Sequence, residues 1–508
     1  MKLLKLPFKL LFNRLTFALT ILIVQIFVIA MAFRFFYNYI IFFFGGLGFL
    51  SFIVVAYILT CKQNSNYKIA WIILVLGFPG IGSLIYLFLQ LQPGPKLLNK
   101  KINENKKESL KYLYQNENLL DSIYDSDVRS LVYYMNNYAR YPMYESGKIT
   151  YFPFGENKFE DLKQELEKAE KFIFLEYFII SKGYVLDSIM EILKKKVKEG
   201  VEVRILYDGT CAFNGIPYNY PDILKEDGIK AKMFSPIKAV ISTHQNNRDH
   251  RKIVVIDGKV AYTGGINLGD EYINKKIRFG VWKDTAIKVT GEAVNSFTTM
   301  FLEMWNIDNL KNEDYKKYIQ DNEEKDKGYI MTYGDNPLDT EPVGRNIYIH
   351  ILNNAKKYVH IMTPYLVLDD ELLNTIKNTA KRGVEIKIIM PHIPDKKTVY
   401  YLSRSYYEEL IKSNVQIYEY EPGFVHGKMF ISDDDKAVVG TTNLDYRSLY
   451  LHFECGCYIY KSNVIKEIKK DFNDTLDNSI VIDKHNIHKY GVIKKIVGII
   501  LRFFAPLM

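Results

Sequence analysis

Hydrophobic and polar positions follow two different patterns along the 508-residue chain. The first 91 residues are dominated by long apolar runs. Leu15–Phe33 is uncharged, as is Tyr39–Thr60, and a third run, Ile69–Leu91, is interrupted near its centre by glycines and a proline. Runs of this length are typical of membrane helices, where Pro and Gly are tolerated if neighbouring groups satisfy the freed backbone. The pattern therefore predicts a membrane module over residues 1–95, with two to three transmembrane helices.

The first of these runs has a competing interpretation as a secretory signal peptide. Leu15–Phe33 is longer than a usual signal core, however, and no small-residue cleavage site precedes the next apolar run. Three spans with the N-terminus inside would put the lysines of residues 96–111 outside, against the positive-inside rule. If residues 15–33 lie in the interface instead, both basic clusters can be cytoplasmic. We therefore expect a multi-pass protein of the cell membrane, with the cytoplasmic side favoured for the rest of the chain.

After a basic helical linker at residues 96–145, short apolar runs alternate with amphipathic stretches. They predict a helix, a strand, a helix and a strand, at Phe159–Glu170, Phe172–Ile179, Val185–Glu199 and Val201–Tyr207. The same order recurs at Leu352–Lys357, Val359–Met362, Glu371–Arg382 and Val384–Met390. Such alternation predicts an α/β fold with two tandem domains, at residues 146–330 and 331–484. We expect a pseudo-twofold axis to relate them, with one site between them.

The end of the chain, residues 485–508, combines apolar residues with Lys494, Lys495 and Arg502. This stretch is short and charged for a spanning helix, and it favours an interfacial amphipathic helix. A terminal helix that covers part of the core is the alternative.

The clearest signal is the pattern His-x-Lys-x-x-x-x-Asp, which occurs twice. His250, Lys252 and Asp257 form the first copy, and His426, Lys428 and Asp433 form the second, 176 residues later. Each copy is followed at the same distance by an asparagine, Asn267 or Asn443. A single His-x-Lys pair would be an ordinary surface feature, but recurrence with Asn in register indicates two half-sites.

This set of side chains suits phosphoryl transfer through a nucleophilic imidazole. One histidine attacks phosphorus and the other protonates the leaving oxygen. The two lysines and the two asparagines would hold the charged phosphoryl oxygens. Asp257 and Asp433 end their runs as turn signals, and we expect them to brace the turn, because a carboxylate beside a transferring phosphate would repel it.

With these residues the chain resembles the phospholipase D superfamily, and most closely the bacterial cardiolipin synthases. Further matches lie at Thr363-Pro364-Tyr365, at residues 443–448 and, in the N-terminal module, at Trp71, Pro79, Gly80 and Tyr86. The resemblance implies a phosphatidyltransferase that joins two phosphatidylglycerol molecules into cardiolipin and releases glycerol. It also implies that His250 is the nucleophile and His426 the general acid. Hydrolysis by a phospholipase D-type phosphodiesterase is the alternative.

A nucleophilic imidazole needs its second nitrogen held, normally by a carboxylate. Asp284 and Glu454 each lie about 30 residues beyond the histidine of their own half, and they are the candidates for this role. Glu176 interrupts an apolar strand, which marks either a polar site or a buried ion pair. The chain departs from the family pattern at His452, where Asn is usual, and at Asp249, Gly427 and Ala286.

The charge distribution bears on the partners. Residues 1–111 hold 13 Lys and Arg against two Glu, whereas the remainder holds 54 basic against 56 acidic residues. Because the basic excess adjoins the apolar runs, it favours contact with anionic membrane lipid over a nucleic-acid groove. The remaining histidines show no metal-ligand spacing, so neither a metal nor a cofactor is implied. The oligomeric state stays open.

Overall fold

The structure is a computed structural model that describes residues 14–35, 40–61, 64–91, 93–237, 246–309, 313–339, 341–487 and 491–507. The chain divides into two compact units, residues 1–92 and 93–506, which are considered separately.

The N-terminal unit consists of helices, namely α2 (Arg14–Phe35), α3 (Ile40–Thr60), α4 (Ser65–Gly77) and α5 (Ile81–Gln90). The predicted third run is thus two helices, because the chain turns at Gly80, whose φ is +84° and whose Cβ, if it had one, would lie 2.5 Å from Leu47. Across the described residues, no helix combines the length and the apolar character needed to cross a membrane. The predicted transmembrane helices are therefore not supported by the structure.

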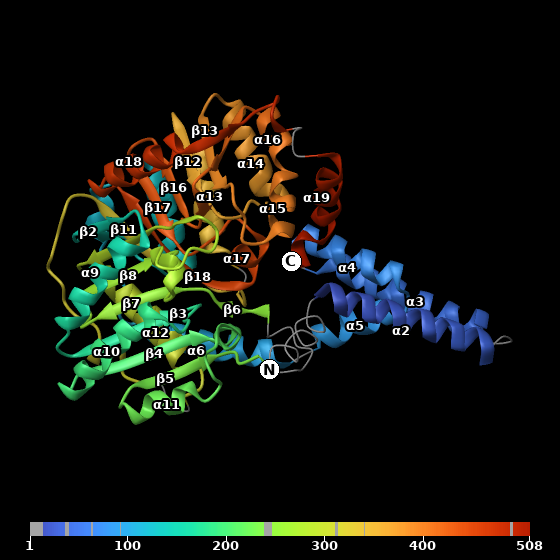
Figure 1. The fold of residues 1–508 in the computed structure, drawn as a ribbon, viewed down its shortest axis with the longest axis horizontal. Helices are drawn as coiled ribbons and strands as arrows, with labels where there is room; N and C mark the ends of the chain where they lie inside the picture. Colours follow the sequence, from blue (N-terminus) through green and yellow to red (C-terminus); the bar gives the residue numbers. More distant parts are fainter. Residues whose placement is uncertain are drawn as a thin grey trace. The chain divides into compact units, whose positions relative to one another are not determined.

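The second unit contains two large mixed sheets (Figure 1). The first runs in the order β2 (Ile149–Phe152), β10 (Ala286–Thr290), β8 (Val260–Gly264), β7 (Lys252–Ile256), β3 (Phe172–Tyr177), β4 (Glu202–Asp208), β5 (Lys230–Phe234). The second runs in the order β1 (Tyr144–Glu145), β11 (Tyr329–Asp335), β18 (His452–Tyr460), β17 (Lys436–Gly440), β16 (Met429–Ser432), β12 (Tyr358–Met362), β13 (Glu385–Pro391), β14 (Val415–Tyr420), β19 (Ser479–Ile482).

The two sheets share one internal plan. In the first, β3, β4 and β5 are parallel and β7 pairs with β3 in the antiparallel sense. In the second, β12, β13 and β14 are parallel and β16 pairs with β12 in the antiparallel sense. This equivalence confirms the predicted α/β class and the duplication.

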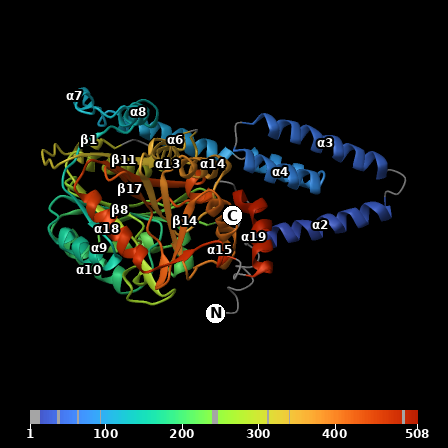
Figure 2. The same ribbon diagram turned by 90° about the horizontal axis from the view of Figure 1, so that it is seen from above.

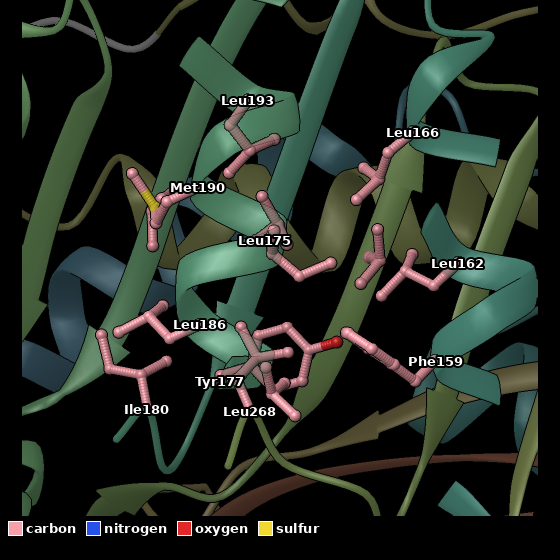
Figure 3. Close-up of a cluster of buried hydrophobic side chains, with 14 of the residues drawn as sticks. Phe159, Leu162, Leu166, Leu175, Tyr177, Ile180, Leu186, Met190, Leu193 and Leu268 are labelled. Carbon is pink, nitrogen blue, oxygen red and sulfur yellow. The ribbon is translucent and has the colours of Figure 1, made fainter. Parts of the chain in front are cut away.

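Alternation along β3 explains how the first sheet is covered. Leu175 and Tyr177 pack against two amphipathic helices, α9 (Gly155–Glu167) and α10 (Tyr184–Lys198), and Figure 3 shows this cluster with Leu162 and Met190. Phe174 points to the opposite face. There it stacks on Phe301 of α12 (Val294–Trp305), with ring centroids 4.5 Å apart, and every residue of that helix is buried.

The other helices flank the sheets or connect their strands (Figure 2). They are α6 (Pro93–Ser109), α7 (Glu117–Asp121), α8 (Ser126–Tyr134), α11 (Tyr220–Glu226), α13 (Val343–Asn354), α14 (Asp370–Lys381), α15 (Lys397–Arg404), α16 (Tyr407–Lys412), α17 (Tyr446–Tyr450), α18 (Val464–Asp477) and α19 (Val492–Phe504). Short turns of other helix types are η1 (Met135–Ala139), η2 (Gly209–Asn214), η4 (Asp270–Ile273), η5 (Tyr315–Lys317) and η7 (Ala505–Leu507).

The predicted elements of both halves agree closely with the structure, with two exceptions. Leu352–Lys357 covers only the end of α13 and the residues that follow it. The predicted linker packs on the first half: the Asn105 amide of α6 donates to the Glu303 carbonyl at 2.8 Å. Pro93 begins α6, a position where a proline is accommodated because the first helical N–H groups have no intrahelical partner.

Candidate active site

The two histidines lie at equivalent positions just before a strand rather than within one. In the first half β7 begins only at Lys252, and in the second half β16 begins at Met429, after Lys428. Each histidine therefore sits in the segment that leads into its strand, where the backbone can turn toward the other half.

Each of these segments is held by the opposite half of the molecule. β6 (Arg248–Asp249) pairs in parallel with β18 of the second half, and β15 (Gly423–Val425) pairs in parallel with β9 (Val281–Lys283) of the first half. The His250 N–H donates to the Phe453 carbonyl at 2.9 Å, and the His426 N–H donates to the Lys283 carbonyl at 2.6 Å. Both histidines are thereby positioned at the junction between the halves.

The carboxylates that contact the histidines also come from the opposite half. His250 Nδ1 lies 2.9 Å from the Glu454 carboxylate, and His426 Nδ1 lies 2.6 Å from Asp284 Oδ2. The sequence analysis assigned each carboxylate to the histidine of its own half, and that pairing is wrong. In sequence, β9 follows His250 and β18 follows His426. In the structure, β9 pairs with the segment before His426, and β18 pairs with the segment before His250. Such reciprocal contacts are the signature of a twofold relation.

The surroundings of the two carboxylates differ. The Thr441 hydroxyl donates to Glu454, whereas Asp284 accepts the Thr285 N–H at 2.8 Å. At the position equivalent to Thr441 the first half has Gly265, where an added Cβ would lie 2.0 Å from Asp284 Oδ1. The backbone thus approaches Asp284 too closely for a side chain at Gly265.

Burial and positive charge together shift the pKa values of the basic groups. Burial is the largest cause in each case. It lowers the pKa of Lys252 to about 8 and that of Lys428 to about 7, although nearby carboxylates oppose the shift. It also lowers the pKa of His250 well below its usual value, with further lowering from Lys252 and Lys428. Burial and Lys428 lower the pKa of His426 to about 4, although Asp284 counteracts part of this lowering.

The two lysines and the two asparagines of the repeat are all buried. Lys252 donates to the His250 carbonyl and Lys428 to the His426 carbonyl. Asn267 Oδ1 accepts the Ile179 N–H at 3.1 Å. Asn443 is buried, and its Oδ1 has no hydrogen-bond partner among the described residues.

Asp257 and Asp433 lie at the far ends of β7 and β16, and each accepts three backbone N–H groups. Asp257 binds those of residues 170–172 at 2.7–2.8 Å, and Asp433 those of residues 356–358 at 2.8–3.0 Å. Both residues have φ +54°. They brace the turn and hold the neighbouring strand, as expected, and they lie away from the histidines.

Several residues beside the histidines were not singled out as site residues from sequence. Phe178 packs edge-on to His250, with ring centroids 4.7 Å apart, and Trp282 lies 5.2 Å from His426.

Glu176, which the sequence marked as either a polar site or a buried ion pair, forms a buried ion pair, because Arg251 Nε donates to it at 2.6 Å. The position equivalent to Arg251 is Gly427, so no repeat signal could have found this pair.

Comparison with known proteins identifies the family. A family model described as "Cardiolipin synthase, PLD-like domain" matches residues 162–305 and 348–476, which together are more than half of the chain. The chain belongs to the cardiolipin synthase family of the phospholipase D superfamily. A second model, "Phospholipase_D-nuclease N-terminal", matches residues 49–90. The protein is accordingly an enzyme of the phosphatidyltransferase type.

Relatives extend over nearly the whole chain. The cardiolipin synthase of Alkalihalophilus pseudofirmus is 32% identical over 455 residues, which are 88% of this chain and 90% of the relative. An uncharacterized protein of Streptococcus mutans is 46% identical over 458 residues, 89% of this chain and 99% of that one. The crystal structure of the phosphatidylserine synthase of Haemophilus influenzae covers 75% of this chain and 98% of its own, with a TM-score of 0.57 and 16% identity, and so shares the fold.

Proposed function

We propose that this member of the cardiolipin synthase family transfers a phosphatidyl group between two phosphatidylglycerol molecules, giving cardiolipin and glycerol. The observation that carries the proposal is the crossed pair of histidine–carboxylate contacts, with two lysines beside them. In each half an imidazole has one nitrogen occupied by a carboxylate, which leaves the other free to act on phosphorus or on an oxygen.

In the first step, His250 Nε2 attacks the phosphorus of phosphatidylglycerol, and the bond from phosphorus to the glycerol headgroup oxygen breaks. His426 donates its proton to that oxygen, and glycerol leaves. In the second step, His426 takes a proton from the terminal hydroxyl of a second phosphatidylglycerol. The resulting oxygen attacks the phosphohistidine, which forms cardiolipin and restores His250. A covalent intermediate exchanges two similar alcohols without an activated donor.

The pKa shifts support this division of roles. The pKa of His250 is lowered well below that of a free imidazole, so its nucleophilic form predominates at neutral pH. His426 has a less extreme shift because Asp284 stabilises its charged form. A bound phosphodiester anion would add negative charge beside His426 and raise its pKa from this lowered value, which a general acid requires. Lys252, Lys428 and the asparagines Asn267 and Asn443 would hold the phosphoryl oxygens.

The lipid product tests the proposal directly. Purified enzyme in vesicles that contain phosphatidylglycerol alone should form cardiolipin and free glycerol in equal amounts. Formation of phosphatidic acid at every glycerol concentration would instead establish the hydrolase, because water would then be the acceptor.

The membrane lipid would be reached through two apolar surfaces. In the N-terminal unit, Phe49, Phe52 and Leu59 are more than half exposed. On α19, Ile493 and Phe503 are also more than half exposed. The opposite side of this helix packs closely on α15, because a Cβ at Gly498 would lie 2.3 Å from the Tyr401 carbonyl oxygen. We propose that both surfaces insert into an anionic membrane, with the catalytic halves on the cytoplasmic side.

Two measurements test the membrane arrangement. An Ile493→Glu/Phe503→Glu variant should sediment less with phosphatidylglycerol vesicles than the parent, and unchanged sedimentation would remove the role of α19. A reporter fused after Gly94 should give a cytoplasmic signal, and an external signal would place the catalytic halves on the other face.

A further inference from the structure

His452 is an unusual side chain beside the proposed nucleophile. It is 7% exposed, and its ring centroid lies 5.3 Å from that of His250. Neither ring nitrogen has a hydrogen-bond partner among the described residues. Because an unpaired buried polar group is costly, an imidazole with two such atoms indicates that a ligand or water completes the site.

Glu454 faces the same space from the same strand. One oxygen is engaged by His250 Nδ1 and by the Thr441 hydroxyl. The other oxygen also lies 2.9 Å from His250 Nδ1, and it lies 3.8 Å from His452 Nδ1. At the equivalent place in the other half, Trp282 occupies the position of His452, and its indole N–H donates to Asp284 at 3.4 Å. Among the described residues, the two unpaired imidazole nitrogens of His452 therefore have no counterpart at Trp282.

Three potential ligand atoms converge here. One atom each from His250, His452 and Glu454 lies within 4.8 Å of the others, and all three side chains are buried. Two imidazoles and a glutamate are a donor set found in zinc sites, where ligands about 2.0–2.1 Å from the ion are separated by roughly 3.3 Å. We propose that His250, His452 and Glu454 form a binding site for zinc or a similar divalent transition metal.

This ion would oppose the proposed catalysis rather than assist it. The nitrogen of His250 that faces Glu454 is Nδ1, so the ion would replace the proton shared by these two groups, and that proton would leave to solvent. The imidazole would then be coordinated to a cation, which reduces its nucleophilicity. Lys252 and Lys428 repel a cation and moderate its affinity, so the metal would act as a reversible inhibitor. Only this inhibition rests on the proposed function; the metal site does not.

Zinc titration of the full-length protein, without lipid, tests the site. Calorimetry with zinc chloride should detect one zinc ion bound per chain of the parent protein. The His452→Asn variant should bind zinc at least about tenfold more weakly, a change within the range for loss of metal-site groups. His452→Gln is the second variant, and circular dichroism checks that both fold. His392→Asn is the matched control, because His392 lies 3.1 Å from Glu419, outside the cluster, and its removal should leave the affinity unchanged. Equal affinity in the parent and both His452 variants would overturn the proposal.

Discussion

The two halves of the catalytic unit are alike where they position a histidine and different where they surround it. In both, a parallel strand pair carries the histidine to a carboxylate of the opposite half, and an aspartate at φ +54° braces the far end of the following strand. Phe178 and His452 pack beside His250, whereas Trp282 packs beside His426. Shared geometry with unequal surroundings agrees with the different tasks that we propose for the two histidines.

The buried charges differ as well. Arg251 and Glu176 form an ion pair beneath His250. The equivalent of Arg251 is Gly427, where a Cβ would lie 2.8 Å from the Met362 sulfur. One half thus fills this space with paired charges and the other with a thioether. Mutations at these positions can therefore compare the contributions of the two halves to stability.

The largest expected effect comes from exchanging the carboxylates for amides. Glu454→Gln and Asp284→Asn should each lower kcat by about 10²–10⁴, the range for disabling a proton-transfer group. With an activated phosphatidyl ester whose leaving group needs no protonation, Asp284→Asn should still form a covalent intermediate and Glu454→Gln should not. The opposite result would contradict the assignment of Glu454 to the nucleophile and of Asp284 to the general acid.

Removing Arg251 should affect stability more than a volume-conserving change at Met362, which lies beside Gly427 in the other half. Arg251→Met leaves Glu176 and Asp249 buried without their cation, which should cost about 3–5 kcal/mol in urea denaturation. Met362→Leu, which conserves volume, should cost less than about 1.5 kcal/mol. Similar costs for the two variants would contradict the unequal packing, and Glu176→Met/Arg251→Met should recover part of the loss.

The Thr441 hydroxyl should contribute a smaller amount. Thr441→Ala removes a donor to the Glu454 carboxylate, worth about 1.5 kcal/mol, and should lower kcat roughly tenfold. Thr442→Ala is the control, because the Thr442 hydroxyl has no partner in the described residues. If both variants have the same kcat, Thr441 does not support Glu454.

The smallest effect at neutral pH should come from replacing Lys428 by arginine, which keeps the positive charge. The pKa values of Lys252 and Lys428, about 8 and about 7, mean that their charges are present at lower pH and are lost as pH rises through this range. The ratio kcat/KM should therefore fall on the alkaline side. Lys428→Arg keeps its charge and should move that limb to higher pH, even with a reduced maximum. If the alkaline fall of kcat/KM stays at the same pH in Lys428→Arg, a group other than Lys428 causes it.

The sequence predicted the duplicated elements well, because short apolar strands and amphipathic helices carry their own periodicity. The repeat spacing also identified His250, His426 and their lysines, which the structure brings to one junction. The crossed pairing of Asp284 and Glu454 could not be predicted, since strand order between halves is not encoded in spacing. The helix break at Gly80 depends on a positive φ and on the approach of Leu47, and these are tertiary features.

Trapping of the covalent intermediate tests the central claim that the halves divide the reaction between nucleophile and acid. The enzyme is incubated with a labelled, activated phosphatidyl ester, and acid-labile label on the protein is measured for parent, His250→Ala and His426→Ala. The account predicts label on the parent and on His426→Ala, and none on His250→Ala. Label on His250→Ala but not on His426→Ala would show that the roles are reversed, and label on neither the parent nor any variant would contradict the phosphohistidine mechanism.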